Sequence, residues 1–468
     1  FVSRAQVGER KMKKNKLVAF IGLLGCLSMT TGCDDGKTIK IWVGNESATF
    51  YQEIANDYIA NHPEFGFNVK VIGADTGSAA GVITQDPSAA GDIYTVAHDN
   101  IGKLVDSNCA KPIIDEELIA QVEANNTEAF KKVCKVKWNN ENYLFGVPYI
   151  SQALMLYYNT ELVTEEQAKT LEGLQEAAAA ASTGTKKVKG ITFTGTDGYN
   201  FSWSLLARKA DDNSSTLKIF EGGEKSNCYA QGDDMVSIVK YQQRLFKDEN
   251  GAMWPTDSGW ATEISNGSAL SVVGGAWHFD AFKSAVGESK MGVTVLPTFT
   301  LTSEDATGSF AAGTTFQAGT FADCKVFMIN GASKQKKYAA CQELIKYFSS
   351  KDIQNLSFKE CLNIPAYIGA DEYIKSIKDE LTTSEYSCAV AQTKMAEYGI
   401  PQPFINGTLN TYYYSKNAPD YYKNMIINDK DSYGTERKIR EGLYTMEHIW
   451  QKGKVPSSFP DTLPEDIQ

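Results

Sequence analysis

The first part of the chain that can fold alternates between apolar runs and amphipathic segments. Three runs have the composition of β-strands: TIKIWVG (38–44), FNVKVIGA (67–74) and DIYTVA (92–97). Residues 48–63 place apolar side chains at helical spacing, and residues 75–91 are typical of a loop followed by a helix. The order strand, helix, strand, helix, strand predicts an open α/β sheet rather than a sandwich or a helix bundle.

A second α/β set follows the first. Strand-like runs occur at residues 142–151, 152–159, 189–195, 268–277, 291–299 and 325–331, and helices are expected near residues 171–182, 201–209, 233–247 and 335–349. Residues 301–320 are rich in Gly, Ser and Thr and are expected to be a connection. The pattern predicts two α/β lobes between which the chain passes more than once. A cleft is expected at their boundary, where ligands usually bind.

The N-terminal residues have the pattern of an export signal. The basic stretch KMKKNK (11–16) precedes the apolar run LVAFIGLLGCL (17–27), which is too short to span a bilayer, and small residues then lead to Cys33. This resembles a bacterial lipoprotein signal, in which the cysteine is lipidated and becomes the first residue. Thr30 departs from that pattern, because such signals usually carry Leu there.

We therefore expect residues 1–11 to be translated upstream sequence, residues 12–32 to be the signal peptide, and Cys33 to carry the lipid. A cleaved signal without lipid and an uncleaved anchor are the alternatives. The lysine-rich signal suggests an extracytoplasmic protein anchored to the cell membrane, at a Gram-positive cell surface.

Charge narrows the range of partners. Without residues 1–32, the counts of 46 Lys and Arg and 57 Asp and Glu fall by six and by one, which leaves a net charge of −16. Nucleic acid and anionic membranes both require clustered cations, so neither is expected as a ligand. No later segment is apolar for long enough to cross a membrane. The only expected membrane contact is therefore the lipid anchor.

The cysteines indicate neither a zinc site nor a dense disulfide framework. Apart from Cys26 and Cys33 there are seven, widely spaced and without a CxxC motif. Cys109 and Cys134 could pair, but small buried thiols are the favoured interpretation. No metal and no cofactor is expected.

Several longer motifs are more specific. The segments GDIYTVAHDNIG (91–102), YLFGVPYISQALMLYYNTELV (143–163), VVGGAWHFDAFKSA (272–285) and GVTVLPTF (292–299) occur in this order. Their order and spacing resemble those of the maltose/maltodextrin-binding proteins, extracellular solute-binding proteins (family 1) of carbohydrate ABC transporters. The resemblance runs from about residue 38 to residue 450.

The resemblance implies a two-lobed clamp of the periplasmic-binding-protein type (type II), with hinge crossovers and a cleft between the lobes. It places residues 37–150 and 302–362 in lobe 1, and residues 151–301 and 363–468 in lobe 2. A monomeric receptor would bind an oligosaccharide in the cleft and deliver it to the ABC transporter permease subunits.

Sugars present hydroxyl groups at their edges and weakly apolar C–H faces, so a site needs polar side chains at the rim and aromatic plates. The resemblance places Asn45 and Glu46 at the sugar, although either end of this turn could instead cap a helix. It also places Asp99 there. Asn100 stands where the family has Arg, and His98 is expected behind the site.

Further candidates come from the later motifs. Gln152 stands where the maltose binders carry a carboxylate, and Trp277 stands where the family stacks a tryptophan next to two glycines. Trp260, Tyr199 and Asn200 also match family contacts, whereas the neighbouring Phe201 and Trp203 are expected in the core. The stacking aromatic of the C-terminal region would have to be Tyr412 or Tyr413.

Catalysis is not indicated. The DTGS stretch that begins at Asp75 matches one half of an aspartic protease site, but no second copy exists, and a turn before a helix is the favoured interpretation. A carbohydrate-active enzyme would need two carboxylates about 5–10 Å apart, for which Glu46 and Asp99 were the candidates. We therefore predict a binding protein without catalytic residues. The alternatives are the same transport role for a non-maltodextrin sugar or another small polar solute, a surface carbohydrate-active enzyme, and a surface adhesin.

Overall fold

The computed structural model describes residues 36–211, 233–246, 259–308, 310–401, 417–428, 433–452 and 454–460. Cys33, Tyr412 and Tyr413 lie outside these ranges, so their predicted roles stay predictions. Among the described helices, none combines the length and the apolar character that crossing a membrane requires.

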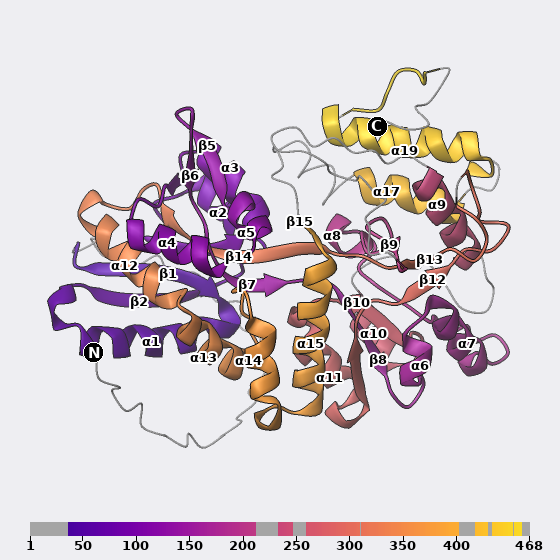
Figure 1. The fold of residues 1–468 in the computed structure, drawn as a ribbon, viewed down its shortest axis with the longest axis horizontal. Coiled ribbons are helices and arrows are strands. Elements are labelled where there is room, and N and C mark those ends of the chain that lie inside the picture. The colour runs from indigo at the N-terminus through magenta and orange to yellow at the C-terminus, as the bar shows by residue number, and fades with distance from the viewer. Residues whose placement is uncertain are drawn as a thin grey trace. The chain divides into compact units, whose positions relative to one another are not determined.

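The first sheet has the predicted alternation. Its strands are β1 (Thr38–Gly44), β2 (Asn68–Ala74), β3 (Ile93–Ala97), β4 (Ala110–Lys111), β7 (Val147–Gln152), β14 (Phe321–Asn330) and β15 (Ile400–Pro401). β1 pairs in parallel with β2 and β3, and β14 runs antiparallel to β3, β4 and β7 (Figure 1). Helices cover this sheet because their apolar residues recur on one face, as Tyr51, Ala55 and Tyr58 do in α1.

The helices packed with this sheet are α1 (Ala48–Asn61), α2 (Ala79–Gln85), α3 (Ile101–Asp106), α4 (Glu116–Asn125), α5 (Glu128–Val133), α12 (Tyr338–Phe348) and α13 (Lys351–Cys361). A separate hairpin is formed by β5 (Lys135–Trp138) and β6 (Glu141–Leu144). Short helical turns are η1 (Asn45–Ser47), η2 (Pro63–Phe65), η3 (His98–Asn100) and η6 (Gln335–Lys337).

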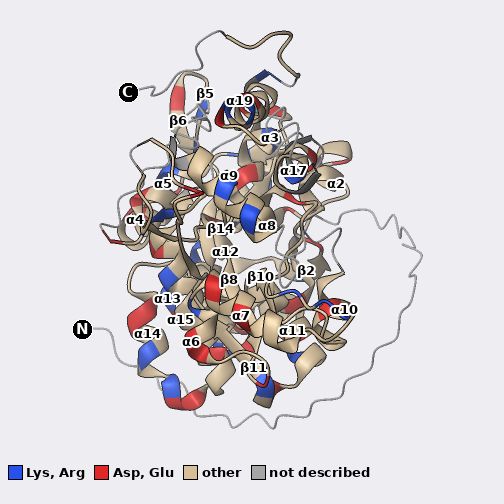
Figure 2. Cartoon of the chain, turned by 90° about the vertical axis from the view of Figure 1, so that its right-hand side faces the viewer, with Lys and Arg blue, Asp and Glu red and all other residues tan. Residues whose placement is uncertain are grey.

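The second α/β set contains two small sheets. In one, β8 (Met155–Asn159) lies between β10 (Ser271–Gly274) and β11 (Met291–Thr294), and all pairs are antiparallel. In the other, β13 (Thr315–Gln317) lies between β12 (Thr298–Thr300) and β9 (Arg208–Lys209). Figure 2 shows that charged residues lie mainly on the helices around these strands.

Those helices are α6 (Glu165–Ala168), α7 (Leu171–Ala181), α8 (Gly198–Phe201), α9 (Asp233–Leu245), α10 (Trp260–Ser265), α11 (Phe279–Val286), α14 (Ala370–Ser376), α15 (Thr383–Tyr398), α17 (Asn417–Lys423) and α19 (Glu436–Lys452). Shorter turns are η4 (Ala276–His278), η5 (Glu288–Lys290), η7 (Lys378–Glu380) and the π-helical η8 (Asn424–Asn428).

Three local predictions were wrong. The strand expected at residues 189–195 forms only isolated bridges, from Lys189 to Ala269 and from Thr192 to Val272. The helix expected near residues 201–209 ends at Phe201, because Arg208 and Lys209 pair with β13 as a strand. The expected connection at residues 301–320 contains β13, which pairs with β12. The buried rings of Phe299 and Phe316 stack 5.5 Å apart there, so two apolar side chains hold a hairpin within a stretch of turn-forming composition.

The chain from Gly36 to Gln468 is one unit with two main cores. We call the core of residues 39–150 and 322–366 the first lobe, and the core of residues 153–321 and 395–446 the second lobe. Phe310 and Phe316 pack in the second lobe, although we assigned residues 302–362 to the first. The other predicted lobe bounds stay a prediction.

Among the described residues, three segments run from one lobe to the other. β7 continues into β8, residues 317–322 lead from β13 into β14, and residues 362–370 link α13 to α14. The last two are tied to the first, because β14 pairs with β7 and the Ser151 N–H donates to the Ile364 carbonyl at 2.8 Å. The predicted repeated passage between lobes is therefore present.

Candidate functional site

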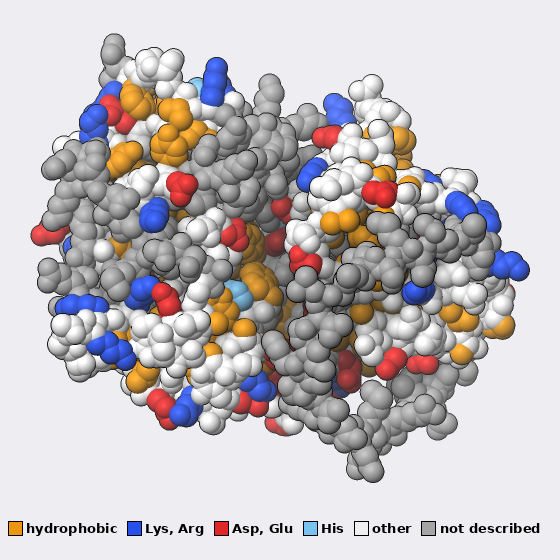
Figure 3. All heavy atoms as spheres, turned by 180° about the vertical axis from the view of Figure 1, so that it is seen from behind, with side chains coloured by type: hydrophobic (Ala, Val, Ile, Leu, Met, Phe, Trp, Pro, Cys, Tyr) orange, Lys and Arg blue, Asp and Glu red, His pale blue; other side chains and the backbone are white. Residues whose placement is uncertain are grey.

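A cavity of about 800 Å³ lies where the two lobes meet, and we call it the cleft. From the first lobe, the turns after β1, β2 and β3 supply lining residues, because the carboxyl ends of parallel strands meet at one edge of a sheet. From the second lobe come residues of α8 and of η4. Seen from behind, hydrophobic and acidic side chains lie along the boundary between the lobes (Figure 3).

Eight of the sequence-predicted binding residues line this cleft: Asn45, Glu46, Asp99, Asn100, Gln152, Tyr199, Asn200 and Trp277. They come from five separate stretches of the chain, so the structure brings together what the sequence only suggested. Their contact with a ligand stays a prediction.

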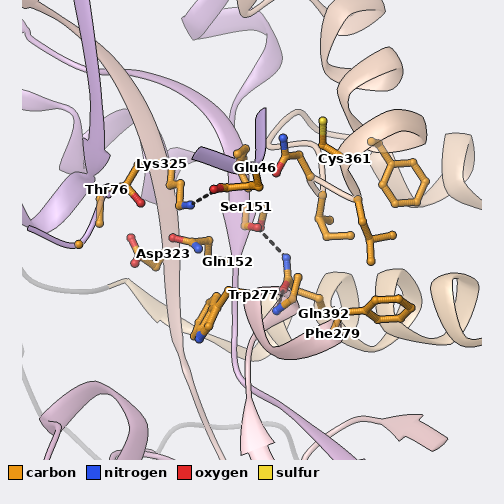
Figure 4. Close-up of a pocket in the computed structure, with 18 of the residues that line it drawn as sticks. Glu46, Thr76, Ser151, Gln152, Trp277, Phe279, Asp323, Lys325, Cys361 and Gln392 are labelled. Carbon is orange, nitrogen blue, oxygen red and sulfur yellow. Dashed lines mark hydrogen bonds and ion pairs between the residues drawn. The ribbon is translucent and has the colours of Figure 1, made fainter. Parts of the chain in front are cut away.

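Trp277 is the exposed aromatic surface of the cleft. It lies in η4 directly after Gly274 and Gly275, and 42% of its surface is exposed. A side chain on Gly275 would collide with the indole ring, which explains the glycine at that position. Figure 4 shows the indole beside Gln152 and Asp323. A flat, half-exposed ring in a cavity is suited to stack against a sugar face.

Asp197 organises α8 at the cleft wall. Its carboxylate accepts hydrogen bonds from the Tyr199 N–H at 2.9 Å and from Asn200 Nδ2 at 2.7 Å. Burial raises the pKa of Asp197 above its ordinary value. The Tyr199 ring lies 5.9 Å from that of Trp277 and stacks on Phe321 at 6.0 Å. Tyr199 and Trp277 thus form a continuous aromatic wall.

A buried ion pair lies behind the cleft. His98 Nδ1 contacts Asp323, which is on β14 beside the point where that strand enters the first lobe. Burial opposes the charged form of His98, but Asp323 outweighs it and raises the pKa of His98 to about 9. His98 is fully buried, as expected of a residue behind the site.

Asp99 directly follows His98 in the chain, and its side chain lines the cleft. Burial, and then the charge of Asp323, raise the pKa of Asp99 to about 7. Asn100 Nδ2 donates to Asp99 Oδ1 at 2.8 Å and so fixes the orientation of the carboxyl group. Asn100 therefore orients the Asp99 carboxyl group, and it does not supply the positive charge of the arginine that the family has at this position.

The turn after β1 does not form the helix cap that we considered as an alternative. Ser47, the residue before α1, makes no side-chain capping bond, and Asn45 is the first residue of η1 rather than the residue before it. Glu46 instead faces the cleft, where its Oε1 lies 3.5 Å from Lys325 Nζ. In the next turn, the Asp75 carboxylate accepts a hydrogen bond from the Ser78 hydroxyl at 2.6 Å, just before α2. The DTGS stretch is thus a turn before a helix, as predicted.

The structure corrects the prediction for Trp260 and agrees with the prediction for the buried thiols. Trp260 does not line the cleft: it is 7% exposed and packs in a core with Tyr157, its ring 4.6 Å from that of His278. Its bulk fills space under η4, so its contact is with protein. Cys109 and Cys134 are both buried free thiols, in agreement with the favoured interpretation.

Several lining residues were missed from the sequence. Asp323 and Lys325 lie within a strand run, and their charge in the otherwise apolar FADCKVFMIN was the available signal. Gln392 on α15 was missed because nothing in a helix of uniform polarity marks it. Its Nε2 donates to the Ser151 carbonyl at 2.6 Å, and its Oε1 accepts from the Ala276 N–H at 3.1 Å. Gln392 therefore ties β7 to η4 across the cleft floor (Figure 4).

A sequence profile of the bacterial extracellular solute-binding protein family matches residues 53–381, more than two thirds of the chain. The chain belongs to this family. The family match confirms the resemblance found in the sequence. The two-lobed α/β fold expected from that resemblance is also confirmed.

Individual relatives are distant but cover most of the chain. The maltooligosaccharide ABC transporter solute-binding lipoprotein of Streptococcus pneumoniae is 21% identical over 392 residues, which cover 78% of this chain and 82% of that protein. The galactooligosaccharide-binding protein of Bacillus subtilis is 22% identical over 390 residues, with 79% and 80% covered. The structure of MalX from Streptococcus pneumoniae with maltopentaose aligns with a TM-score of 0.63 at 19% identity, over 87% of this chain and 99% of MalX.

Proposed function

We propose that this solute-binding protein is the lipid-anchored receptor of an ABC importer. In this proposal it binds malto-oligosaccharides or a related oligosaccharide in the cleft and delivers them to the permease. The observation that carries the proposal is the lining of the cleft, where carboxylates and amides from both lobes surround the half-exposed Trp277. A saccharide needs both kinds of partner, polar groups at its edge and an aromatic plate against its face.

The two-lobed arrangement supplies a mechanism. A ligand that touches Asp99 on the first lobe and Trp277 on the second stabilises the arrangement in which both are near. To convert an equilibrium from 1:99 to 99:1, the ligand must bind the closed form about 10⁴-fold more tightly than the open form. The permease would then recognise the closed form of the receptor. This scheme requires no cofactor, no metal and no second copy of the receptor.

The anchor belongs to the same proposal. The segment before Cys33 resembles a lipoprotein signal, and the pneumococcal relative is named a lipoprotein. A lipid on Cys33 would hold the receptor at the outer face of a Gram-positive membrane, next to its permease.

A thermal-shift scan of the purified protein tests the ligand. The panel contains maltose, maltotriose, longer maltodextrins, galacto-oligosaccharides and cello- and xylo-oligosaccharides. A ligand present at a hundred times its dissociation constant stabilises the fold by about 2.7 kcal/mol. A shift with the α-glucans alone supports the maltodextrin assignment, and a shift with galacto-oligosaccharides alone redirects it. No shift with any saccharide would refute the proposal.

The same samples distinguish a receptor from an enzyme or an adhesin. The cleft holds more carboxylates than the two candidates from the sequence, so each bound sugar is incubated for days and then analysed by chromatography. Intact sugar agrees with a receptor, and products of defined length would identify a hydrolase. Stabilisation by polysaccharide but by no short oligosaccharide would point to an adhesin.

A further inference from the structure

The cleft carries a surplus of negative charge. Its lining includes eight carboxylates, those of Glu46, Asp75, Asp99, Asp197, Asp280, Asp323, Glu360 and Glu385. The two lysines in the lining are already ion-paired: Lys325 Nζ lies 3.5 Å from Glu46, and Lys359 Nζ lies 2.8 Å from Glu380 Oε2. These two lysines therefore offset only part of the carboxylate charge in the lining.

Three of the carboxylates line the cleft from separate elements of the fold. Burial, followed by the charges of Asp323, Asp197 and Asp99, raises the pKa of Tyr199 well above its usual value. These three aspartates come from β14, from the turn before α8 and from η3, and all three line the cleft that Tyr199 also lines. His98 pairs with Asp323 and offsets one of the three charges.

The hydrogen-bonding groups at this point are mostly acceptors. Asn200 is 7% exposed, and its Nδ2 is used by Asp197. Its Oδ1 is buried and has no hydrogen-bond partner among the described residues. An unpartnered amide oxygen, on a side chain that is held by Asp197 in a cleft lined by carboxylates, calls for a ligand that brings donors. A hydroxyl brings one donor together with its own lone pairs, whereas an ammonium group brings three donors and no acceptor.

The aromatic wall favours the same kind of ligand. Tyr199 and Trp277 lie 5.9 Å apart, and a cation near the face of an indole is attracted by its π-electrons. A metal ion is a poorer match: in the described part of the chain, no group of three or more His, Cys, Asp or Glu side chains is arranged to hold one. The charge of the cleft is therefore better matched by an organic cation.

We propose that the cleft selects an oligosaccharide that carries a protonated amine, with the ammonium group between Asp99, Asp197 and Asp323 beside Trp277. This inference rests on the proposed function and narrows its ligand to the amino-substituted saccharides. It also excludes saccharides with carboxylate or phosphate groups, because a buried like-charge contact would oppose their binding.

Matched probes on two backbones test this inference by isothermal titration calorimetry at pH 7.5, above the pKa of about 7 of Asp99, so that its carboxylate is charged. The α-linked set is maltotriose and four derivatives in which the C2, C3, C4 or C6 hydroxyl of the terminal glucose is replaced by an amine. The β-linked set is cellotriose, the glucosamine trimer and the N-acetylglucosamine trimer. Within one set, the best amine is expected to bind at least about tenfold more tightly than its neutral counterpart.

Charge variants separate recognition of the amine from a general charge effect. Asp197→Asn is expected to reduce the amine-to-neutral affinity ratio to within about threefold. Glu161→Gln removes one negative charge outside the cleft, where Glu161 pairs with Lys290, and should leave the ratio unchanged. A pH at which the amine is neutral should abolish the preference.

The outcomes separate this inference from the proposed function. Neutral probes that bind as tightly as every amine in both sets would overturn the inference and leave the oligosaccharide receptor intact. An equal loss of the ratio in Glu161→Gln would also overturn it, because the effect would then be long-range. No binding of any saccharide would refute both.

Discussion

Replacement of Trp277 by alanine should weaken oligosaccharide binding by more than an order of magnitude. Trp277 is 42% exposed within the cleft. Because a large aromatic side chain has about 250 Å² of surface, the ring area open to a ligand is on the order of 100 Å². At about 25 cal/mol per Å², coverage of that area is worth about 2.5 kcal/mol, and coverage of one face about half as much. Since 1.4 kcal/mol is tenfold in affinity, the dissociation constant should rise roughly 10- to 60-fold.

The assay is isothermal titration calorimetry with the saccharide that gives the largest thermal shift. Trp138→Ala is the matched control, because Trp138 is 38% exposed but lies on the β5–β6 hairpin outside the cleft. Urea unfolding of both variants verifies that the fold is retained. If Trp277→Ala bound the sugar within twofold of the unchanged protein, the aromatic plate would not be a contact and the reasoning would fail.

Four further predictions concern stability and anchoring. Trp260→Ala removes a buried ring and should lower the free energy of unfolding by about 3–5 kcal/mol, measured with urea, and a loss below 1 kcal/mol would contradict its core position. Gln392→Leu leaves a carbonyl of β7 and an N–H of η4 without their hydrogen-bond partner and should lower the free energy of unfolding by about 1–3 kcal/mol in the same assay. An unchanged midpoint of unfolding would show that water replaces the amide. The pKa of Asp99 is about 7 in the folded protein and ordinarily 3.8, so the folded state binds more protons between these pH values and loses stability as the pH rises through them. Relative to the unchanged protein, Asp99→Asn should therefore gain stability between pH 4.5 and pH 7.5. A stability difference in urea unfolding that stays constant over this range would contradict the assigned pKa. Cys33→Ser should move the protein from the detergent phase to the aqueous phase in a phase-separation assay of expressing cells, and retention in the detergent phase would mean a different anchor.

Sequence patterns predicted the parts of the fold that depend on neighbouring residues. The apolar runs at β1, β2 and β3 and the helix between the first two follow from local periodicity, and their polar end residues meet because parallel strands end at one edge. For this reason Glu46 and Asp99 reach the same cleft. The hairpin of β12 and β13 was missed because only two buried phenylalanines oppose a turn-forming composition.

The parts of the site that depend on distant pairing were not predictable. Trp260 and Trp277 are the same residue type in similar sequence surroundings, and only the packing of Trp260 against His278 makes one a core residue. Asp323 is stable in a buried strand because His98, 225 residues earlier, lies beside it. A single sequence does not reveal such a partner, so the charge cluster behind the cleft remained hidden.

The position of β14 in the sheet has a consequence for how the chain acquires its fold. β14 pairs with β3, β4 and β7, yet its first residue, Phe321, follows the last residue of β3, Ala97, by more than two hundred positions. Residues 38–150 leave the ribosome long before this strand exists, so their sheet has no partner to complete it. Contacts of such sequence separation make folding slow. If the chain is exported, as we propose, this delay would keep the early part unfolded during passage through the membrane, and formation of the β14 ladder would then complete the first sheet.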